Sequence, residues 1–270
     1  MWILLFSSLV SAQTVPSAKC TLGAEKTEMT SGWYKIQGDM VNLREQPSTT
    51  GTVLAQIPLG STAKVSGCVK QEKIGDKSGC WYKVDQITTK GVTTQYESAH
   101  LYFTALARCY IAGDFDEDGV LEEAFLSQTG EEQFQVRLSD PNAKVPMTWI
   151  VEDAYSNFTS IYSVPKSKTG RTMLVMSIGP EACGYTGYEH YFIYDSKGKP
   201  TLHKSISEQS FSDSPAYFNS TIDWKNDGTL VYNEDYTTGS SSQKYCLKGF
   251  QYTPCGPKTE TKKEVMDTGL

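Results

Sequence analysis

Short strand-like runs separated by turn residues make up residues 34 to 104. Val41–Arg44 alternates apolar and polar positions, Trp81–Val84 is rich in aromatic residues, and Pro47 and Gly60 interrupt the pattern between them. No helical period persists for more than a few residues, so we expect strands rather than helices. The pattern predicts a small five-strand barrel.

Residues 105 to 256 repeat a different pattern three times: an apolar run, a polar loop and an alternating strand that ends at a turn. The apolar runs are Glu123–Leu126, Met173–Met176 and Leu230–Tyr232. They begin about 49 and 57 residues apart, near the length of a propeller blade. Because an ordinary propeller needs about 4–8 blades, we expect a partial propeller or three packed hairpins. The fold class predicted for the chain is all-β, with a small barrel and a domain of propeller-blade-like hairpins.

The two ends of the chain differ from these units. Residues 1 to 12 are mostly apolar and end in Val10-Ser11-Ala12, a pattern typical of a signal-peptidase site. We expect a signal peptide and a secreted or periplasmic protein; a buried first strand is the alternative. Residues 13 to 33 would form a leader segment, and residues 257 to 270, charged and without aromatic residues, a flexible tail. No other stretch is long and apolar enough to cross a membrane.

The chain has seven cysteines, which in an exported protein favour disulfides. No Cys-x-x-Cys spacing indicates a metal-thiolate site. Two pairs, Cys68 with Cys80 and Cys246 with Cys255, could each close one hairpin, and we expect both bonds. The partners of Cys20, Cys109 and Cys183 stay open, and the odd count leaves at least one thiol unpaired or bridged to another chain.

The most specific chemical pattern lies between residues 111 and 126. Aspartates at every second position place three carboxylates around one loop, and Gly119 stands where the loop must turn sharply. An oxygen-only set of ligands suits a hard cation, above all calcium. The expected ligands are Asp114, Asp116, Asp118, the Val120 backbone carbonyl and Glu122. The alternative is a solvated acidic turn that binds no ion.

This loop, followed by the apolar run Ala124–Leu126, resembles the calcium loop of FG-GAP or integrin-type propeller blades. An EF-hand would instead need a glutamate at the position of Phe125, and helices on both sides. The resemblance implies a calcium-stabilised β domain. The related stretch Asp223–Gly228 has Lys225 at its third position, so we expect only a hairpin turn there.

Residues 34 to 104 resemble the bacterial SH3-like domain through Val-Asn-Leu-Arg at 41–44, Pro47-Ser48, Gly60 and Trp-Tyr-Lys-Val at 81–84. The stretch between Cys68 and Cys80 is an inserted loop relative to that pattern. The resemblance implies recognition of a cell-wall peptide or glycan, and we expect Trp81 and Tyr82 to contribute an aromatic surface for it.

Few features of the chain indicate catalysis. None of its three histidines lies in a recognisable catalytic motif, and a net charge of −6 without a Lys/Arg cluster argues against nucleic acid. The stretch Gly179–His190 could stack its rings on a sugar or peptide, although a long hairpin loop explains it too. The sequence therefore predicts a bacterial binding module rather than an enzyme; the alternative is a cell-envelope hydrolase of unrecognised type.

Overall fold

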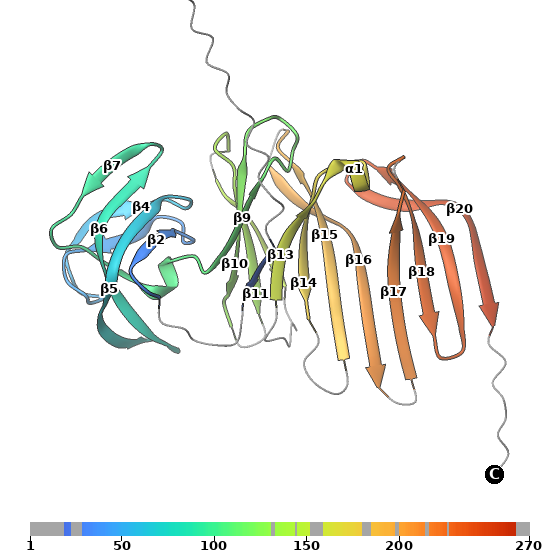
Figure 1. The fold of residues 1–270 in the computed structure, drawn as a ribbon, viewed down its shortest axis with the longest axis horizontal. Helices are drawn as coiled ribbons and strands as arrows, with labels where there is room; N and C mark the ends of the chain where they lie inside the picture. Colours follow the sequence, from blue (N-terminus) through green and yellow to red (C-terminus); the bar gives the residue numbers. More distant parts are fainter. Residues whose placement is uncertain are drawn as a thin grey trace, which may run out of the picture.

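A computed structural model describes residues 19–22, 29–130, 133–143, 145–151, 159–179, 185–197, 200–213, 216–225 and 227–262. The predicted signal peptide, residues 1 to 12, lies outside this set. The described strands form three antiparallel sheets that follow one another along the long axis of the molecule (Figure 1). The all-β fold class is confirmed.

The first sheet is the SH3-like unit. Its strands are β2 (Gly32–Lys35), β3 (Val41–Arg44), β4 (Val53–Ile57), β5 (Thr62–Ile74), β6 (Lys77–Thr89), β7 (Val92–Gln95) and β8 (His100–Tyr102). They are ordered β2-β5-β6-β8-β3-β4, with β7 beside β6. Alternate residues such as Ala63 and Val65 point into a core that also holds Leu43, Val84 and Leu101. Residues 69–79, expected as a loop, instead lengthen β5 and β6 into one long hairpin.

A four-stranded sheet follows, ordered β12-β11-β10-β9. Its strands are β9 (Cys109–Gly113), β10 (Glu122–Gln128), β11 (Phe134–Ser139) and β12 (Met147–Val151). In β11 the buried positions Phe134, Val136 and Leu138 alternate with half-buried ones, as expected of a strand with one face on a core. That core lies between this sheet and the third one, so the two sheets pack as a sandwich.

The third sheet has nine described strands, and apart from β1 it is a meander in chain order. Its strands are β1 (Cys20–Leu22), β13 (Thr159–Val164), β14 (Met173–Ile178), β15 (Tyr185–Asp195), β16 (Thr201–Asp213), β17 (Ala216–Trp224), β18 (Thr229–Tyr236), β19 (Gly239–Lys248) and β20 (Gln251–Lys262). The short helix α1 (Lys166–Thr169) connects β13 to β14.

This sheet curls, and its inner face encloses a second core. Met173, Val175 and Ile193 from its first strands pack with Leu230 and Tyr252 from its last ones. The three repeated segments of the sequence are therefore not separate propeller blades. Each hairpin continues to pair with the next strand along the backbone, so the second and third segments share one sheet while the first belongs to the four-stranded sheet.

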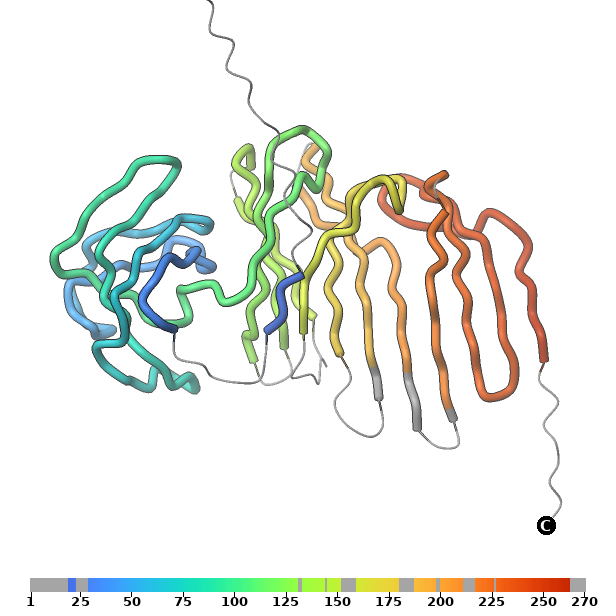
Figure 2. Tube along the Cα trace, in the orientation of Figure 1, coloured from blue at the N-terminus to red at the C-terminus, as the bar shows by residue number. Residues whose placement is uncertain are grey.

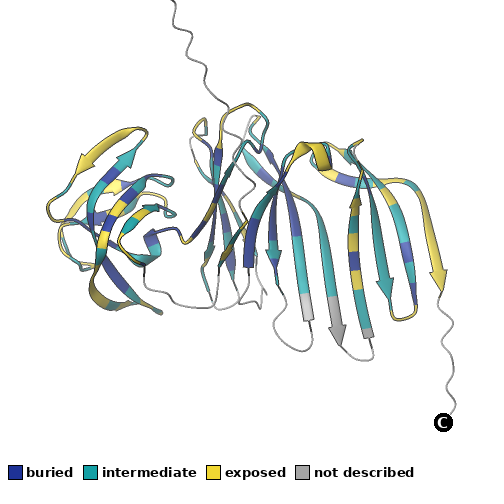
Figure 3. Ribbon diagram, in the orientation of Figure 1, coloured by how far each residue is buried: buried dark blue, intermediate teal, exposed yellow. Residues whose placement is uncertain are grey.

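Two chain segments differ from their expected assignments. The leader segment contains β1, which pairs with β13 in the third sheet although it precedes the SH3-like unit (Figure 2). At the other end, β20 continues to Lys262, so residues 257–262 are strand rather than tail. Their charged side chains are exposed at the sheet edge (Figure 3), where charge discourages pairing with other molecules. Residues 263–270 lie outside the described set.

Three disulfides occur among the described residues. Cys68–Cys80 and Cys246–Cys255 each close a hairpin, with Cα atoms 5.6 and 5.7 Å apart. Cys20–Cys109 joins β1 to β9 and so links the two layers of the sandwich. Since disulfides persist in oxidising compartments, these bonds point to a location outside the cytoplasm. No helix in the described part of the chain is long and apolar enough to span a membrane.

Candidate metal centre

The acidic loop connects two neighbouring strands of the four-stranded sheet. Gly113, the last residue of β9, is paired with Glu122, the first residue of β10, so the chain between them must reverse direction. Three aspartates of the loop meet Glu122 at its base, and one ligand atom of each of the four carboxylates lies within 4.8 Å of the others. The pairing of β9 with β10 therefore places Glu122 next to the three aspartates.

Backbone donors hold one side of this cluster. The N–H of Gly119 donates to Asp114 Oδ2 (3.1 Å) and that of Val120 to Asp118 Oδ1 (2.7 Å). The N–H of Phe115 donates to Glu122 Oε2 at 2.6 Å. Gly119 has a φ of +90°, a conformation that glycine adopts without steric cost. The carbonyl of Val120 stays a predicted ligand.

The other side of the cluster has unmet hydrogen-bonding capacity. Asp114 Oδ1, Asp116 Oδ2 and Glu122 Oε1 are buried oxygen atoms without a hydrogen-bond partner. Glu122 is 0 % exposed. Burying a carboxylate oxygen without a partner is costly, so three such atoms in one cluster indicate a place for a cation. The donor set consists of oxygen alone and fits a hard metal ion.

Electrostatics around Glu122 agree with this geometry. Burial, together with the neighbouring carboxylates of Asp116, Asp140 and Asp114, raises the pKa of its carboxyl to about 8, although the hydrogen bond from the Phe115 N–H acts to lower it. A cation among these groups would remove the repulsion and favour the ionised form.

A second loop, between β11 and β12, supports the cluster from outside. The side-chain amide of Asn142 donates to Asp118 Oδ2 at 3.1 Å, and the N–H of Asn142 donates to Asp140 Oδ1 at 2.6 Å. The Tyr194 hydroxyl donates to Asp140 Oδ2 at 2.6 Å, and burial raises the pKa of that phenol. Sequence reasoning missed these residues. The turn signal Asp-Pro-Asn is visible at 140–142, but only the tertiary structure places it beside the loop.

Glu117 ties the tip of the loop to the nine-stranded sheet. Its backbone has a φ of +66°, its carboxylate is paired with Lys166 on α1, and it accepts the N–H of Thr172 at 2.9 Å. Burial acts to raise the pKa of this carboxyl, but the hydrogen bonds from Lys166 and Thr172 prevail and lower it. The cluster therefore lies where both layers of the sandwich meet.

The aromatic residues expected to bind ligand are both buried, Tyr82 in the barrel core and Trp81 outside that core against the Tyr102 ring. Trp81 is 3 % and Tyr82 2 % exposed. The Trp81 ring donates its N–H to Glu72, and the Tyr82 hydroxyl accepts the N–H of Met29. Their burial leaves a ligand no ring face to stack on. In the stretch 179–190, Tyr188 and His190 belong to strand β15 and stack at 5.7 Å, while residues 180–184 lie outside the described set.

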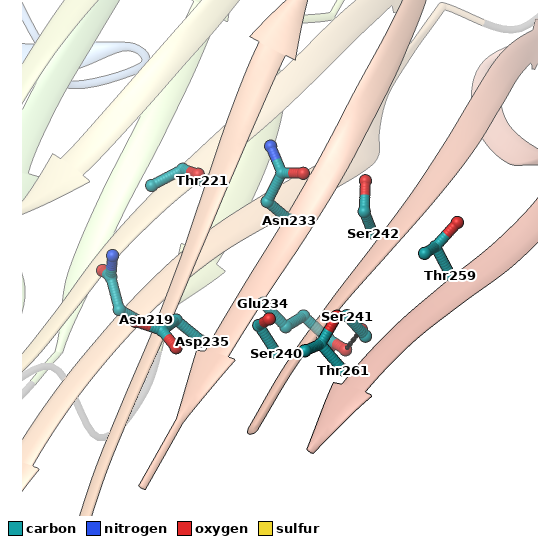
Figure 4. A pocket seen from close by; sticks show the side chains of 10 residues that line it. All are labelled: Asn219, Thr221, Asn233, Glu234, Asp235, Ser240, Ser241, Ser242, Thr259 and Thr261. Atoms are coloured by element: carbon teal, nitrogen blue, oxygen red, sulfur yellow. Dashed lines mark hydrogen bonds between the residues drawn. The ribbon is translucent and has the colours of Figure 1, made fainter. Parts of the chain in front are cut away.

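A shallow polar hollow of about 200 Å³ lies on the third sheet (Figure 4). Strand register aligns two rows of short polar side chains across β17 to β20. These rows are Asn219-Asp235-Ser240-Thr261 and Thr221-Asn233-Ser242-Thr259. The hollow is smaller than the roughly 300–1,000 Å³ of common ligand pockets, and its lining includes no aromatic ring.

The SH3-like unit has a recognised family. Residues 38–94 match the family model of the bacterial SH3 domain. This stretch covers β3, β4, β5, β6 and most of β7, with most of the barrel core described above, and the match suggests a binding module. The match does not extend to the two sheets that follow. No curated protein and no solved structure significantly matches the chain.

Proposed function

We propose that the protein is an exported bacterial binding protein in which a calcium ion stabilises the sandwich next to an SH3-like unit that recognises a cell-envelope peptide or glycan. The observation that supports the metal most directly is the set of three buried, unpartnered oxygens of Asp114, Asp116 and Glu122. The family match of residues 38–94 supports the binding role.

Calcium fits this site better than other common cations. Its ligands are oxygen atoms, six to eight in number, in a flexible arrangement. Four carboxylates come together in one loop, and the Val120 carbonyl that we predict would add to them, whereas this cluster offers no sulfur or nitrogen ligand that would favour zinc or copper. Magnesium demands a smaller, near-octahedral geometry and keeps most of its waters, so it should bind more weakly here.

Thermal unfolding with calcium, with magnesium and with chelator tests the metal. Extracellular calcium modules bind with dissociation constants of about 10⁻⁴–10⁻³ M, and calcium at tenfold excess over that constant adds about 1.4 kcal/mol to the free energy of unfolding. Glu122→Gln should lose most of this gain, since it removes the buried ligand charge. Asp223→Asn, in the degenerate loop, should keep it. Equal melting temperatures of the wild type in calcium and in chelator would refute the metal site.

Binding to purified bacterial cell wall tests the recognition role. The calcium-loaded protein should sediment with insoluble wall and leave the wall intact, which is measured as wall-derived sugar and peptide in the supernatant. Release of soluble fragments would favour the hydrolase instead. Failure to sediment with walls of several compositions would contradict the envelope-binding role and leave the calcium result unaffected.

A further inference from the structure

A tryptophan of the SH3-like unit is exposed to solvent. Trp33 on β2 is 55 % exposed. Its neighbour Tyr34 packs against the barrel core, and successive side chains of a strand point to opposite faces of the sheet, so the Trp33 ring points outward. Single exposed apolar residues are common on proteins, and the surroundings of this ring therefore decide whether it can bind a ligand.

Strand pairing places polar side chains beside this ring. Following the paired residues from β2 through β5 and β6 to β7 gives the row Trp33-Lys64-Gln86-Gln95, and the next row on the same face contains Thr62-Thr88-Thr93. All seven residues are exposed or half-buried, whereas Ala63 and Ile87 on the opposite face are buried in the core. Adjacent strands lie about 4.8 Å apart, so the first row spans about 14 Å. We call these seven residues the Trp33 platform.

The strand that carries Trp33 is held in place by contacts with the rest of the molecule. Lys35 Nζ lies 2.6 Å from Glu123 Oε1 in the four-stranded sheet. The N–H of Ala107 donates to Lys35 O at 2.7 Å. A surface that is formed before a ligand arrives lowers the entropic cost of binding.

Amide and hydroxyl groups of the Trp33 platform have capacity for further hydrogen bonds. Gln95 Nε2 donates to Gln86 Oε1 at 3.0 Å, which among the described residues leaves the N–H groups of Gln86 and the carbonyl oxygen of Gln95 for a ligand. The hydroxyls of Thr88 and Thr93 share one hydrogen bond of 2.9 Å, so both keep acceptor positions. These groups complement a ligand that is rich in hydroxyl groups.

A sugar fits this combination better than a peptide does. One face of a pyranose ring consists of C–H groups that stack on an indole ring, while its rim carries hydroxyls that pair with amides and threonines. An extended peptide would instead need an open sheet edge for its backbone hydrogen bonds. The central strands under the Trp33 platform, β5 and β6, are each paired on both sides, so their side chains alone are available to a ligand.

Lys64 places a positive charge one strand away from Trp33. This lysine is exposed and has no ion-pair partner among the described residues, so its ammonium can receive a carboxylate. Asp85 follows Val84 and precedes Gln86 in β6, and the Ser66 hydroxyl lies 2.6 Å from both of its carboxylate oxygens. Because like charges repel, Asp85 disfavours a ligand with dense negative charge. The Trp33 platform therefore complements sugars with well-separated carboxylates.

We propose that the Trp33 platform binds a glycan whose sugars carry isolated carboxylates, with the Trp33 ring stacking on one sugar and Lys64 receiving a carboxylate. The proposal rests on the binding function proposed above and assigns its ligand class and its surface on the SH3-like unit. This surface provides the exposed ring face that the buried Trp81 and Tyr82 do not.

The test uses the whole protein in excess calcium and two tetrasaccharide probes. One alternates N-acetylglucosamine with N-acetylmuramic acid, whose lactyl group has a free carboxyl, and the other consists of N-acetylglucosamine alone. In NMR titrations the acidic probe should shift the indole N–H signal of Trp33 and the side-chain amide signals of Gln86 and Gln95. The neutral probe should bind about threefold more weakly. An unshifted Trp33 signal with the acidic probe at millimolar concentration, or equal affinity for both probes, would overturn the proposal.

Variants assign the two parts of the interaction to separate residues. Trp33→Ala should weaken both probes about tenfold, because the stacking surface is lost. Lys64→Gln should weaken the acidic probe about threefold and leave the neutral probe unchanged. The matched control is Lys73→Gln, an exposed lysine further along β5, which should leave both affinities unchanged. Equal losses in Lys73→Gln and Lys64→Gln, or normal binding by a folded Trp33→Ala variant, would contradict the assignment. Gln95→Ala, at the exposed end of the row, should also weaken both probes and provides a second test if Trp33→Ala does not fold.

Two comparisons separate this proposal from its alternatives. Tighter binding of the peptide Ala-Glu-Lys-Ala-Ala than of the acidic tetrasaccharide, with the same Trp33 shifts, would overturn the glycan assignment. A Trp33→Ala variant that sediments with cell wall as well as the wild type does would refute the Trp33 platform alone. A wild type that binds the acidic probe but no cell wall would refute the proposed envelope-binding function and support the Trp33 platform.

Discussion

A pair of glutamates inside the curled sheet should make stability depend on pH. Glu189 and Glu208 stand directly opposite each other on β15 and β16. The Tyr191 hydroxyl lies 2.9 Å from an oxygen of each carboxylate. It has one proton and can donate to only one of them, so the other contact is favourable only if one carboxyl is protonated. The Tyr162 hydroxyl donates to Glu189 at 2.9 Å.

The pKa of Glu208 shows the consequence. Burial, and then the neighbouring Glu189, raise it to about 6 from its usual 4.5, against the hydrogen bonds from Tyr191 and Ile222 that lower it. The folded protein therefore holds this proton more tightly than the unfolded chain does. Its stabilising contribution is complete below pH 4.5 and is lost as the pH rises through about 6. One pKa unit corresponds to about 1.4 kcal/mol, so the loss is about 1–2 kcal/mol.

Glu208→Gln imitates the protonated carboxyl at every pH. Its amide can donate to Glu189, and its carbonyl can accept from Tyr191. We expect the variant to be more stable than the wild type by about 1–2 kcal/mol at pH 8, a rise of a few degrees in melting temperature, and equal to it near pH 4.5. The measurement is denaturant unfolding across this range with the same excess of calcium for both proteins, so that the proposed metal site contributes equally to each.

The matched control is Glu97→Gln, an exposed glutamate of the SH3-like unit, whose stability should follow that of the wild type at each pH. A Glu208→Gln variant that is less stable than the wild type at pH 8 would refute the shared proton. A gain of the same size at pH 4.5 and pH 8 would refute it too, since a titrating group must act in only one part of the range.

Two further predictions concern packing and covalent linkage. A Cβ added at Gly79 would lie 2.0 Å from Cδ1 of the Phe103 ring, so Gly79→Ala should lower the free energy of unfolding by about 1–3 kcal/mol, measured by denaturant titration. Replacing Cys20 and Cys109 by serine unlinks the two layers of the sandwich and should lower it by about 2–5 kcal/mol. A double variant with unchanged stability would show that packing alone holds β1 in place.

The local pattern of the chain was enough to predict its fold class and the outline of its SH3-like unit. The strands of the barrel were visible because their alternation and turn residues act over a few positions, and the match of residues 38–94 confirms that unit. Likewise, the spacing of Asp114, Asp116 and Asp118 brings three carboxylates together through the geometry of one loop. Physical causes that act between near neighbours can be read from sequence.

Arrangement over long distances was decided only by the tertiary structure. β1 pairs with β13 although the whole SH3-like unit lies between them in the sequence, and Cys20 forms a disulfide with Cys109 at a separation of 89 residues. No local pattern encodes either partner, because many strand pairings satisfy the same alternation. The polar strand end from 257 to 262 forms because β19 supplies backbone hydrogen bonds, a contribution that composition does not reveal.

For the candidate metal site, too, the sequence decided one part and the tertiary structure another. The sequence contains the four carboxylates, but the burial of Glu122 and the nearby Asp140 and Asn142 come from the packing of two sheets and a second loop. Burial changes what those carboxylates can do, since a carboxylate in water is stable as an ion whereas a buried one without a partner favours binding a cation or a proton.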